Sequence, residues 1–253
     1  MLKFEILGSN ISILNSYKDC YIILVNTVKN SQKSEYITVN NVHTVVEGIK
    51  NKNYKNITNN AILALPDGKP LSIYAKLKGE KNISRIFGPT FFEKTLEWGQ
   101  EDNLKHYFFG SSRETLNKML DVIKTKYPKA VVSGSCSPPY RQFTEKENDE
   151  FLKVINNSDS DLIWVGLGAP KQEIWMYENY KKMKRGVMIG IGAGFDYLAG
   201  NTKHAPEWMK NSSLEWLYRL IQEPGRLWKR YLITNTMFIY FIILELLKLK
   251  KFE

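Results

Sequence analysis

The sequence predicts an α/β fold: a Rossmann-like, mainly parallel sheet flanked by helices, with a helical C-terminal appendage. Over residues 1–202, short β-rich apolar runs alternate with helical patterns. This alternation is typical of βαβ units and of a parallel sheet. The composition then changes to aromatic, arginine-rich segments. We therefore expect a Rossmann-like domain over residues 1–202 and a basic, apolar helical appendage over residues 203–253.

The strands are expected where short apolar runs are bounded by polar or turn-forming residues. The clearest helical stripe covers Glu114–Lys126, where apolar residues recur at i, i+3, i+4 and i+7 from Leu116. Helices are also expected over Glu145–Asn156 and Lys171–Lys182. The expected strands are Phe4–Leu7, Tyr36–Val39, Ala61–Leu65, His106–Phe109, Ala130–Val132, Leu162–Val165 and Val187–Ile191.

The chain of 253 residues carries a formal net charge of +10. Such a charge favours an anionic partner, either nucleic acid, a phosphorylated substrate or an acidic membrane, although a solvated basic surface explains it equally well. The two cysteines lack a pairing motif, and the N-terminus lacks a signal-peptide apolar segment, so a reducing cytosol is expected. The three histidines show no ligand spacing, and we expect neither a metal nor a cofactor.

Small and polar residues follow most of the expected strands. The segments "PDG", "GSSR", "SGSCSPPYR", "GLGAPKQE" and "GAGFD" all begin where a strand is expected to end. Parallel α/β sheets bind ligands beyond the carboxyl ends of their strands. The sequence therefore predicts a ligand site at this rim. The Asp-x-Asp at Asp159–Asp161 precedes a strand, so we interpret it as a loop on the opposite rim.

The segment "GLGAPKQE" joins an expected strand to an expected helix. Gly166 and Gly168 permit tight turns and close approach of a ligand. The exposed amides of the helix start form an anion site. Lys171 and Gln172 are expected to face the ligand, and Glu173 to complement the helix dipole.

The C-terminal segment contains three arginines, of which Arg226 and Arg230 are four residues apart and share a helix face, while Arg219 precedes a Pro-Gly break. The apolar run Tyr231–Leu247 is shorter than the roughly 20 residues of a membrane span. Basic residues flank it, so we expect a helix lying on an anionic membrane surface, which deletion after Tyr231 would release. The alternative is a helix packed on the core or on another subunit.

Seven segments together resemble one family. In chain order they are "TVNNVH", "PDG", "RIFG", "GLGAPKQE", "GAGFDYLAG", "APEWM" and "LEWLYRLIQEPGR". The ordered set is similar to the WecG/TagA/CpsF family, glycosyltransferase family 26, from about residue 35 to 232.

The resemblance implies a cytoplasmic enzyme, peripheral on the inner face of the cell membrane, with residues 1–202 as its catalytic domain. It implies an inverting transfer of a hexose-type sugar from a UDP-sugar to an undecaprenyl-diphosphate-linked sugar in teichoic acid, capsule or other surface-polysaccharide biosynthesis, without a metal. The appendage would dock on the membrane and cover the site. The donor, N-acetylmannosamine-type or another hexose, stays open, and "GSCSPPYRQFT" slightly favours a capsule-type member. A homo-oligomer also stays open, and no nucleic-acid partner is expected.

The resemblance places catalytic roles on three residues. Asp67, in the Pro-Asp-Gly turn, corresponds to the family's proposed catalytic aspartate, and it would take the proton of the acceptor hydroxyl. Thr38 and Asn40 match the family's Thr-x-Asn and would hydrogen-bond sugar hydroxyls or the acceptor, as would Gln172. The alternative for Asp67 is a purely structural turn.

Further residues are assigned to substrate binding. Arg85, the helix start and the tail arginines would stabilise the leaving diphosphate. Asp196, with Gly192 and Gly194, would contact the nucleotide. His204 stands where the family often has an arginine, which puts a phosphate contact there in doubt. The substrate-binding candidates are Arg85, Gln172, Lys171, Gly166, Gly168, Gly192, Gly194, Asp196, Arg219, Arg226 and Arg230.

Two rival functions are weighed against the transferase. An epimerase on the same sheet would need an early dinucleotide fingerprint, which the chain lacks. A non-enzymatic basic module that binds membrane or RNA would not need Asp67 and would show salt-dependent RNA affinity.

Overall fold

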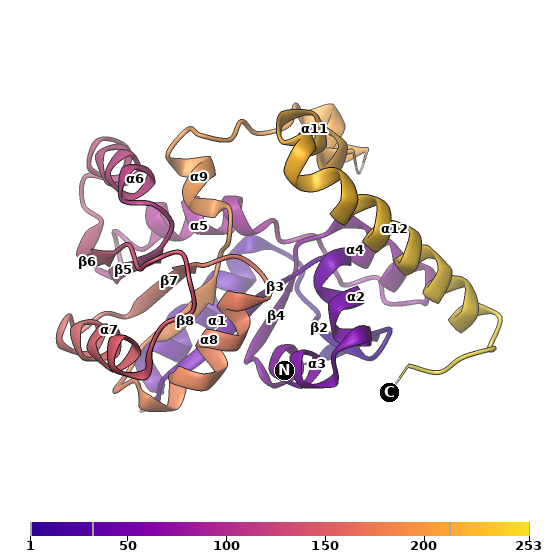
Figure 1. Ribbon diagram of the computed structural model, residues 1–253, viewed down its shortest axis with the longest axis horizontal. Helices are drawn as coiled ribbons and strands as arrows, with labels where there is room; N and C mark the ends of the chain where they lie inside the picture. Colours follow the sequence, from indigo (N-terminus) through magenta and orange to yellow (C-terminus); the bar gives the residue numbers. More distant parts are fainter. Residues whose placement is uncertain (1, 32, 213, 253) are drawn as a thin grey trace.

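The computed structural model describes residues 2–31, 33–212 and 214–252. These residues form a six-stranded parallel sheet with helices on both faces, a two-stranded antiparallel hairpin and a helical C-terminal segment (Figure 1). The strand order in the main sheet is β4-β3-β8-β7-β5-β6. The predicted fold class is confirmed. The strands are β3 (Glu35–Asn40), β4 (Leu63–Pro66), β5 (Lys105–Gly110), β6 (Val131–Cys136), β7 (Leu162–Gly166) and β8 (Val187–Gly190).

Alternating side chains of the strands build a separate core on each face of the sheet. Trp164 belongs to one core and its neighbours Ile163 and Val165 to the other. The first core is covered by α1 (Tyr17–Asn30), α5 (Gly88–Trp98), α6 (Arg113–Lys126) and α9 (Gly194–Leu198). The second is covered by α3 (Lys52–Asn60), α7 (Glu145–Asn157) and α8 (Lys171–Asn179).

The helix positions show where the expected ligand-binding rim lies along the sheet. The helices that follow β5 and β7 cover opposite faces, although the two strands are neighbours in the sheet. The carboxyl ends of these strands are therefore a topological switch point, the place where open α/β sheets bind their ligands. Gly110 and Gly166 pair at this end, and the Ser111 N–H donates to the Gly166 carbonyl at 3.1 Å.

The N-terminal region differs from the sequence prediction. A single strand was expected over Phe4–Leu7, but β1 (Lys3–Ile6) pairs antiparallel with a second strand, β2 (Ser9–Ser12). The segment "SNIS" has little strand signal of its own. It is held by its pairing with β1 and by the Ser12 hydroxyl, which accepts from the Ala64 N–H at 2.9 Å.

The expected helices agree with the structure apart from their ends. The Ser112 hydroxyl caps α6 by accepting from the Thr115 N–H, and α7 begins with a capping box between Thr144 and Glu147. The helix expected over Lys171–Lys182 is α8 followed by a short 3-10 helix, η1 (Tyr180–Lys182).

The described residues of the C-terminal segment form three helices, of which the last is long and packs on the N-terminal part of the chain (Figure 1). Phe238 and Phe241 of this helix enter a third core with the β1–β2 hairpin. In the described part of the chain, no helix is long and apolar enough to cross a membrane. The three helices are α10 (Glu207–Asn211), α11 (Glu215–Gln222) and α12 (Pro224–Leu246), and the third core also includes residues of α2 (Val42–Lys50) and α4 (Lys69–Leu77).

Candidate functional site

The turn that carries Asp67 is fixed by the neighbouring strand. The N–H groups of Asp67 and Gly68 both donate to the carbonyl of Asn40 at the end of β3, at 2.8 and 3.2 Å. The Asp67 Oδ1 accepts from the Gly88 N–H at 2.7 Å. Its Oδ2 makes no hydrogen bond to any residue that the structure describes. One carboxylate oxygen is therefore held by the backbone, and the other is available to bind a proton or a ligand.

Charges around Asp67 act on its proton affinity in opposite directions. Burial raises the pKa of the Asp67 carboxyl above its usual range, and Glu215 raises it further, whereas Arg85 and the Gly88 N–H lower it. Burial is the largest of these effects. A carboxylate with a raised pKa is a better proton acceptor near neutral pH than an ordinary aspartate.

Arg85 joins the Asp67 turn to the C-terminal helices. Its Nε donates to the Asp67 carbonyl at 2.6 Å, and its Nη2 donates to Glu215 Oε2 at 2.5 Å. The guanidinium also lies over the Phe87 ring, 4.6 Å from its centroid. Glu215 is not among the residues predicted from the sequence. Its place in the segment "LEWLYRLIQEPGR" was the only signal that could have indicated it.

The three tail arginines lie in different surroundings. Arg219 is mostly buried, lies 5.7 Å from the centroid of the Tyr197 ring and interacts electrostatically with Asp67. Burial and, to a lesser extent, the nearby Arg230 lower the pKa of the His43 imidazole to about 4. Arg226 is exposed and pairs with Glu223. Neither Arg219 Nε nor Arg230 Nε has a hydrogen-bond partner among the described residues, although both atoms are buried.

Thr38 and Asn40 are both buried at the carboxyl end of β3. The Asn40 amide donates to the Thr38 hydroxyl at 2.9 Å, and the Asn40 carbonyl supports the Asp67 turn. The structure thus brings the three predicted catalytic residues together. Their contacts with a substrate stay a prediction.

Gln172 faces inward and joins two glycine loops. Its Oε1 accepts from the N–H groups of Gly168 and Gly192, at 3.1 and 3.0 Å. A Cβ at Gly166 would lie 2.7 Å from the Phe195 ring, and Gly168 has a φ of +79°, so both positions require glycine.

The surroundings of Glu173 differ from the expectation of a carboxylate that complements the helix dipole. Its side chain is fully buried, because the first turn of α8 packs toward α3 rather than toward solvent. Glu173 Oε1 accepts from the Gln172 amide at 2.7 Å. Burial raises the pKa of this carboxyl to about 7.

The side-chain contacts of Lys171 and Asp196 lie away from the Asp67 turn and from the Gln172–Glu173 pair. The Lys171 ammonium lies over the ring of the exposed Tyr140, 5.1 Å from its centroid. Asp196, at the start of α9, accepts from the Asn201 amide at 3.3 Å. The helix α9 begins at Gly194, so this glycine and Asp196 share one short helix after β8.

Two further sequence features have structural partners. The His204 Nε2 lies 3.3 Å from Glu93, which also pairs with Lys126. Asp159 lies before β7, as expected, and pairs with Lys105 and Arg185. In the part of the chain that the structure describes, no three histidine, cysteine or acidic side chains converge as metal ligands would.

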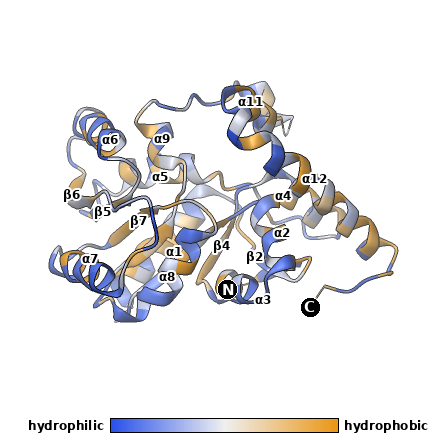
Figure 2. Ribbon diagram, viewed as in Figure 1, coloured by the Kyte–Doolittle hydropathy of each residue, from blue (hydrophilic) through white to orange (hydrophobic). Residues whose placement is uncertain are grey.

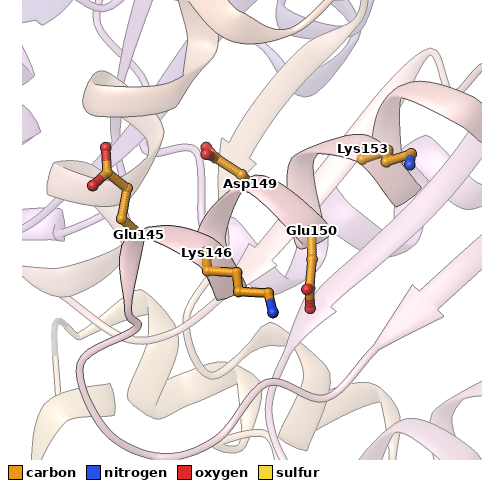
Figure 3. A pocket seen from close by; sticks show the side chains of 5 residues that line it. All are labelled: Glu145, Lys146, Asp149, Glu150 and Lys153. Atoms are coloured by element: carbon orange, nitrogen blue, oxygen red, sulfur yellow. The ribbon is translucent and has the colours of Figure 1, made fainter.

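A surface hollow on α7 is not part of the rim site (Figure 3). Charged side chains from one helix line it, and they project in different directions (Figure 3). No second element contributes a converging group. The lining residues are Glu145, Lys146, Asp149, Glu150 and Lys153.

The parallel sheet and its polar carboxyl rim define an α/β protein of the Rossmann-like class. The sequence pattern of the Glycosyl transferase WecG/TagA/CpsF family matches residues 4–252, so the chain belongs to this family. The resemblance is confirmed, and the chain is a glycosyltransferase. The alternatives of a basic module without enzymatic activity and of an epimerase are not supported.

Curated relatives cover most of the chain. A protein from Bacillus subtilis (strain 168) is 29% identical over 88% of this chain and 85% of its own length. One from Bacillus spizizenii is 29% identical over 83% of this chain and 79% of its own length. One from Staphylococcus aureus (strain MW2) is 24% identical over 98% of this chain and 95% of its own length. Each is named N-acetylglucosaminyldiphosphoundecaprenol N-acetyl-beta-D-mannosaminyltransferase.

Proposed function

We propose that this chain transfers an N-acetylmannosamine-type or related hexose from a UDP-sugar to an N-acetylglucosamine carried on undecaprenyl diphosphate. The product would serve teichoic acid, capsule or another surface polysaccharide. The names of the relatives support the acceptor and the sugar. The observation that carries the proposal is the Asp67 carboxylate, which has one oxygen anchored by Gly88 and the other available beside Arg85.

In the proposed reaction, Asp67 Oδ2 takes the proton of the acceptor hydroxyl. The hydroxyl oxygen attacks the anomeric carbon, and the bond from that carbon to the β-phosphate oxygen of UDP breaks, which inverts the anomeric centre. Burial raises the pKa of Asp67, which improves it as a base. General-base assistance contributes typically about 10²–10⁴-fold to such a step.

The leaving UDP gathers negative charge on its diphosphate. Arg85 and Arg219, both close to Asp67, are the cations we assign to this charge. The start of α8 adds few donors, because Pro170 has no N–H and the Gln172 N–H donates to the Gly168 carbonyl at 3.0 Å. Because the two arginines are held before the reaction, they stabilise the developing charge without reorganisation. Independence from metal ions stays a prediction.

The lipid acceptor requires access to a membrane surface, which we assign to the outward face of α11 and α12. Trp216, Trp228 and Leu232 are exposed on these helices, and Arg226 and Lys229 lie nearby in the sequence and are also exposed. Figure 2 shows hydrophobic positions along much of α12. Exposed apolar residues next to basic ones are typical of helices that lie on anionic bilayers. We accordingly propose a peripheral position on the inner face of the cell membrane.

The test measures UDP release from a panel of UDP-sugars with a short-chain lipid-diphosphate N-acetylglucosamine acceptor, with EDTA present. We expect acceptor-dependent release by the intact chain and a loss of about 10²–10⁴-fold for Asp67→Asn. UDP binding by calorimetry should change little in that variant, since the amide keeps the shape of the turn. Full activity of Asp67→Asn would remove Asp67 as the base. Failure of the intact chain to bind UDP or use any donor would contradict the proposed function.

A further inference from the structure

The orientation of the Gln172 amide follows from its hydrogen-bond partners. The groups at Gly168 and Gly192 are backbone N–H groups, which can only donate. The atom that both approach, at 3.1 and 3.0 Å, must therefore be the acceptor Oε1. The Gln172 Nε2 then points the opposite way, against Gly190 of β8. This one side chain spans the loops that follow β7 and β8.

The Glu173 carboxylate accepts a hydrogen bond from the NH2 group of the Gln172 side chain. Its Oε1 lies 2.7 Å from Gln172 Nε2, and both side chains are buried. A buried donor without a partner costs free energy, so the carboxylate favours the one amide orientation that also satisfies both glycine loops. Tyr54 of α3 faces the same carboxyl. Neither Glu173 Oε2 nor the Tyr54 hydroxyl has a well-formed hydrogen bond among the described residues.

We propose that Glu173 is a positioning residue for the donor site: through Gln172 it holds the two glycine loops at the separation that the nucleotide diphosphate requires. This rests on the proposed function, in which the rim of β7 and β8 binds the UDP-sugar. Glu173 itself is too deeply buried to touch the substrate. Its effect therefore reaches the ligand only through Gln172 and the positions of the two glycine loops that Gln172 Oε1 holds.

The test compares Glu173→Met with Glu173→Gln. Methionine fills a similar volume but accepts no strong hydrogen bond, whereas glutamine retains an acceptor for the Gln172 amide. We expect Glu173→Met to weaken UDP binding, measured by calorimetry, by about tenfold or more, and Glu173→Gln to restore it to within about threefold of the native chain. The Michaelis constant for the donor should rise with little change in kcat. Tyr54→Phe is the matched control, because it alters the same buried cluster but keeps the Glu173–Gln172 bond.

A second measurement does not depend on any ligand. Hydrogen exchange of the amides of Gly168 and Gly192 should accelerate in Glu173→Met and not in Tyr54→Phe. In a Gln172→Leu background, Glu173→Met should add no further loss of UDP affinity, because the two residues act through one amide.

The outcomes separate the two proposals. If the native chain binds no UDP, the proposed function fails, and the exchange rates then decide only whether Glu173 holds the two glycine loops. If the native chain binds UDP but Glu173→Met binds it equally well, the positioning role of Glu173 is overturned. The same holds if the losses of UDP affinity in Gln172→Leu and Glu173→Met add in the double variant. Unchanged exchange at both glycines would overturn it as well.

Discussion

Arg85 and Glu215 form an ion pair at 2.5 Å between the loop before α5 and the first residue of α11, 130 positions later in the chain. The same guanidinium donates to the Asp67 carbonyl. The C-terminal segment is therefore tied to the turn that carries the proposed base. Because Glu215 also raises the pKa of Asp67, the docking of α11 and the basicity of that carboxylate are linked.

Glu215→Gln should lower kcat and change its pH dependence. Loss of a charge-assisted hydrogen bond costs about 1.5–3 kcal/mol, so we expect roughly tenfold or more lower activity. Removal of the negative charge lowers the pKa of Asp67, so the acid limb of the rate profile should move to lower pH. Rates with a saturating donor from pH 5 to 8 measure both effects.

Glu114→Gln is the control for that variant. Glu114 forms an exposed ion pair with Lys118 on α6, and exposed pairs contribute little to stability. Its rate profile should match that of the native chain. An unchanged acid limb in Glu215→Gln would show that Glu215 does not act on Asp67.

Phe238 and its neighbour Ile239 test how α12 is attached. Phe238 is 4% exposed in the core beneath α12, and Ile239 is 60% exposed. Phe238→Ala should lower the free energy of unfolding by about 3–5 kcal/mol, because it leaves a cavity. Ile239→Ala should change it by less than about 0.5 kcal/mol. Urea denaturation of both variants measures the difference, and equal values would mean that α12 is not docked in solution.

Membrane binding is best tested on the exposed face of α12. Deletion after Tyr231 would also remove Phe238 and Phe241 from the core, so released protein could simply be unfolded. Leu232→Ser combined with Ile239→Ser changes only residues that are 63% and 60% exposed. We expect the double variant to sediment less with anionic liposomes and to keep its thermal midpoint.

Ile22→Ser is the matched control, because Ile22 is a comparably exposed apolar residue on α1. It should sediment like the native chain. Added salt should weaken sedimentation of the native chain, since the basic residues contribute through screened attraction. Equal sedimentation of the double variant and the native chain would contradict the membrane surface that we assign to α12.

The sheet could be predicted from the sequence because its strands are short apolar runs between amphipathic helices. All seven expected strands exist, with ends shifted by a few residues. The strand β2 could not be predicted, since "SNIS" becomes a strand only through its partner β1. The position of the Asp67 turn at the carboxyl rim of the sheet could be predicted, because the Pro-Asp-Gly segment comes at the end of an apolar run.

The surroundings of two acidic residues of the candidate site could not be predicted. A glutamate in the first turn of a helix ordinarily complements the dipole at the surface, and nothing local in the sequence shows that α3 covers Glu173. Glu215 is likewise an ordinary helix residue until the fold brings Arg85 against it. Both roles arise from packing between elements that are distant in the chain.

The raised pKa of Glu173 also makes stability depend on pH. Its pKa rises from 4.5 to about 7 on folding, because burial disfavours the charged form. Between these values the unfolded chain has lost the proton and the folded chain still binds it, so this group reduces stability as pH rises through the window. The effect is largely complete above pH 7. Burial also raises the pKa of Tyr54, which faces this carboxyl, so the phenol stays protonated throughout.

Glu173→Gln isolates this effect, because glutamine does not titrate. A shift of this size corresponds to a loss on the order of 3 kcal/mol between pH 4.5 and 7. All other ionisable groups are shared by the two proteins, so the difference between their free energies of unfolding reports Glu173 alone. We expect that difference to move in favour of Glu173→Gln from pH 5 to 7 and to level off by pH 8, as measured by urea denaturation. A difference that stays constant with pH would mean that Glu173 is already ionised in the folded chain at pH 5, held by the Gln172 amide and by Tyr54 more strongly than burial opposes it.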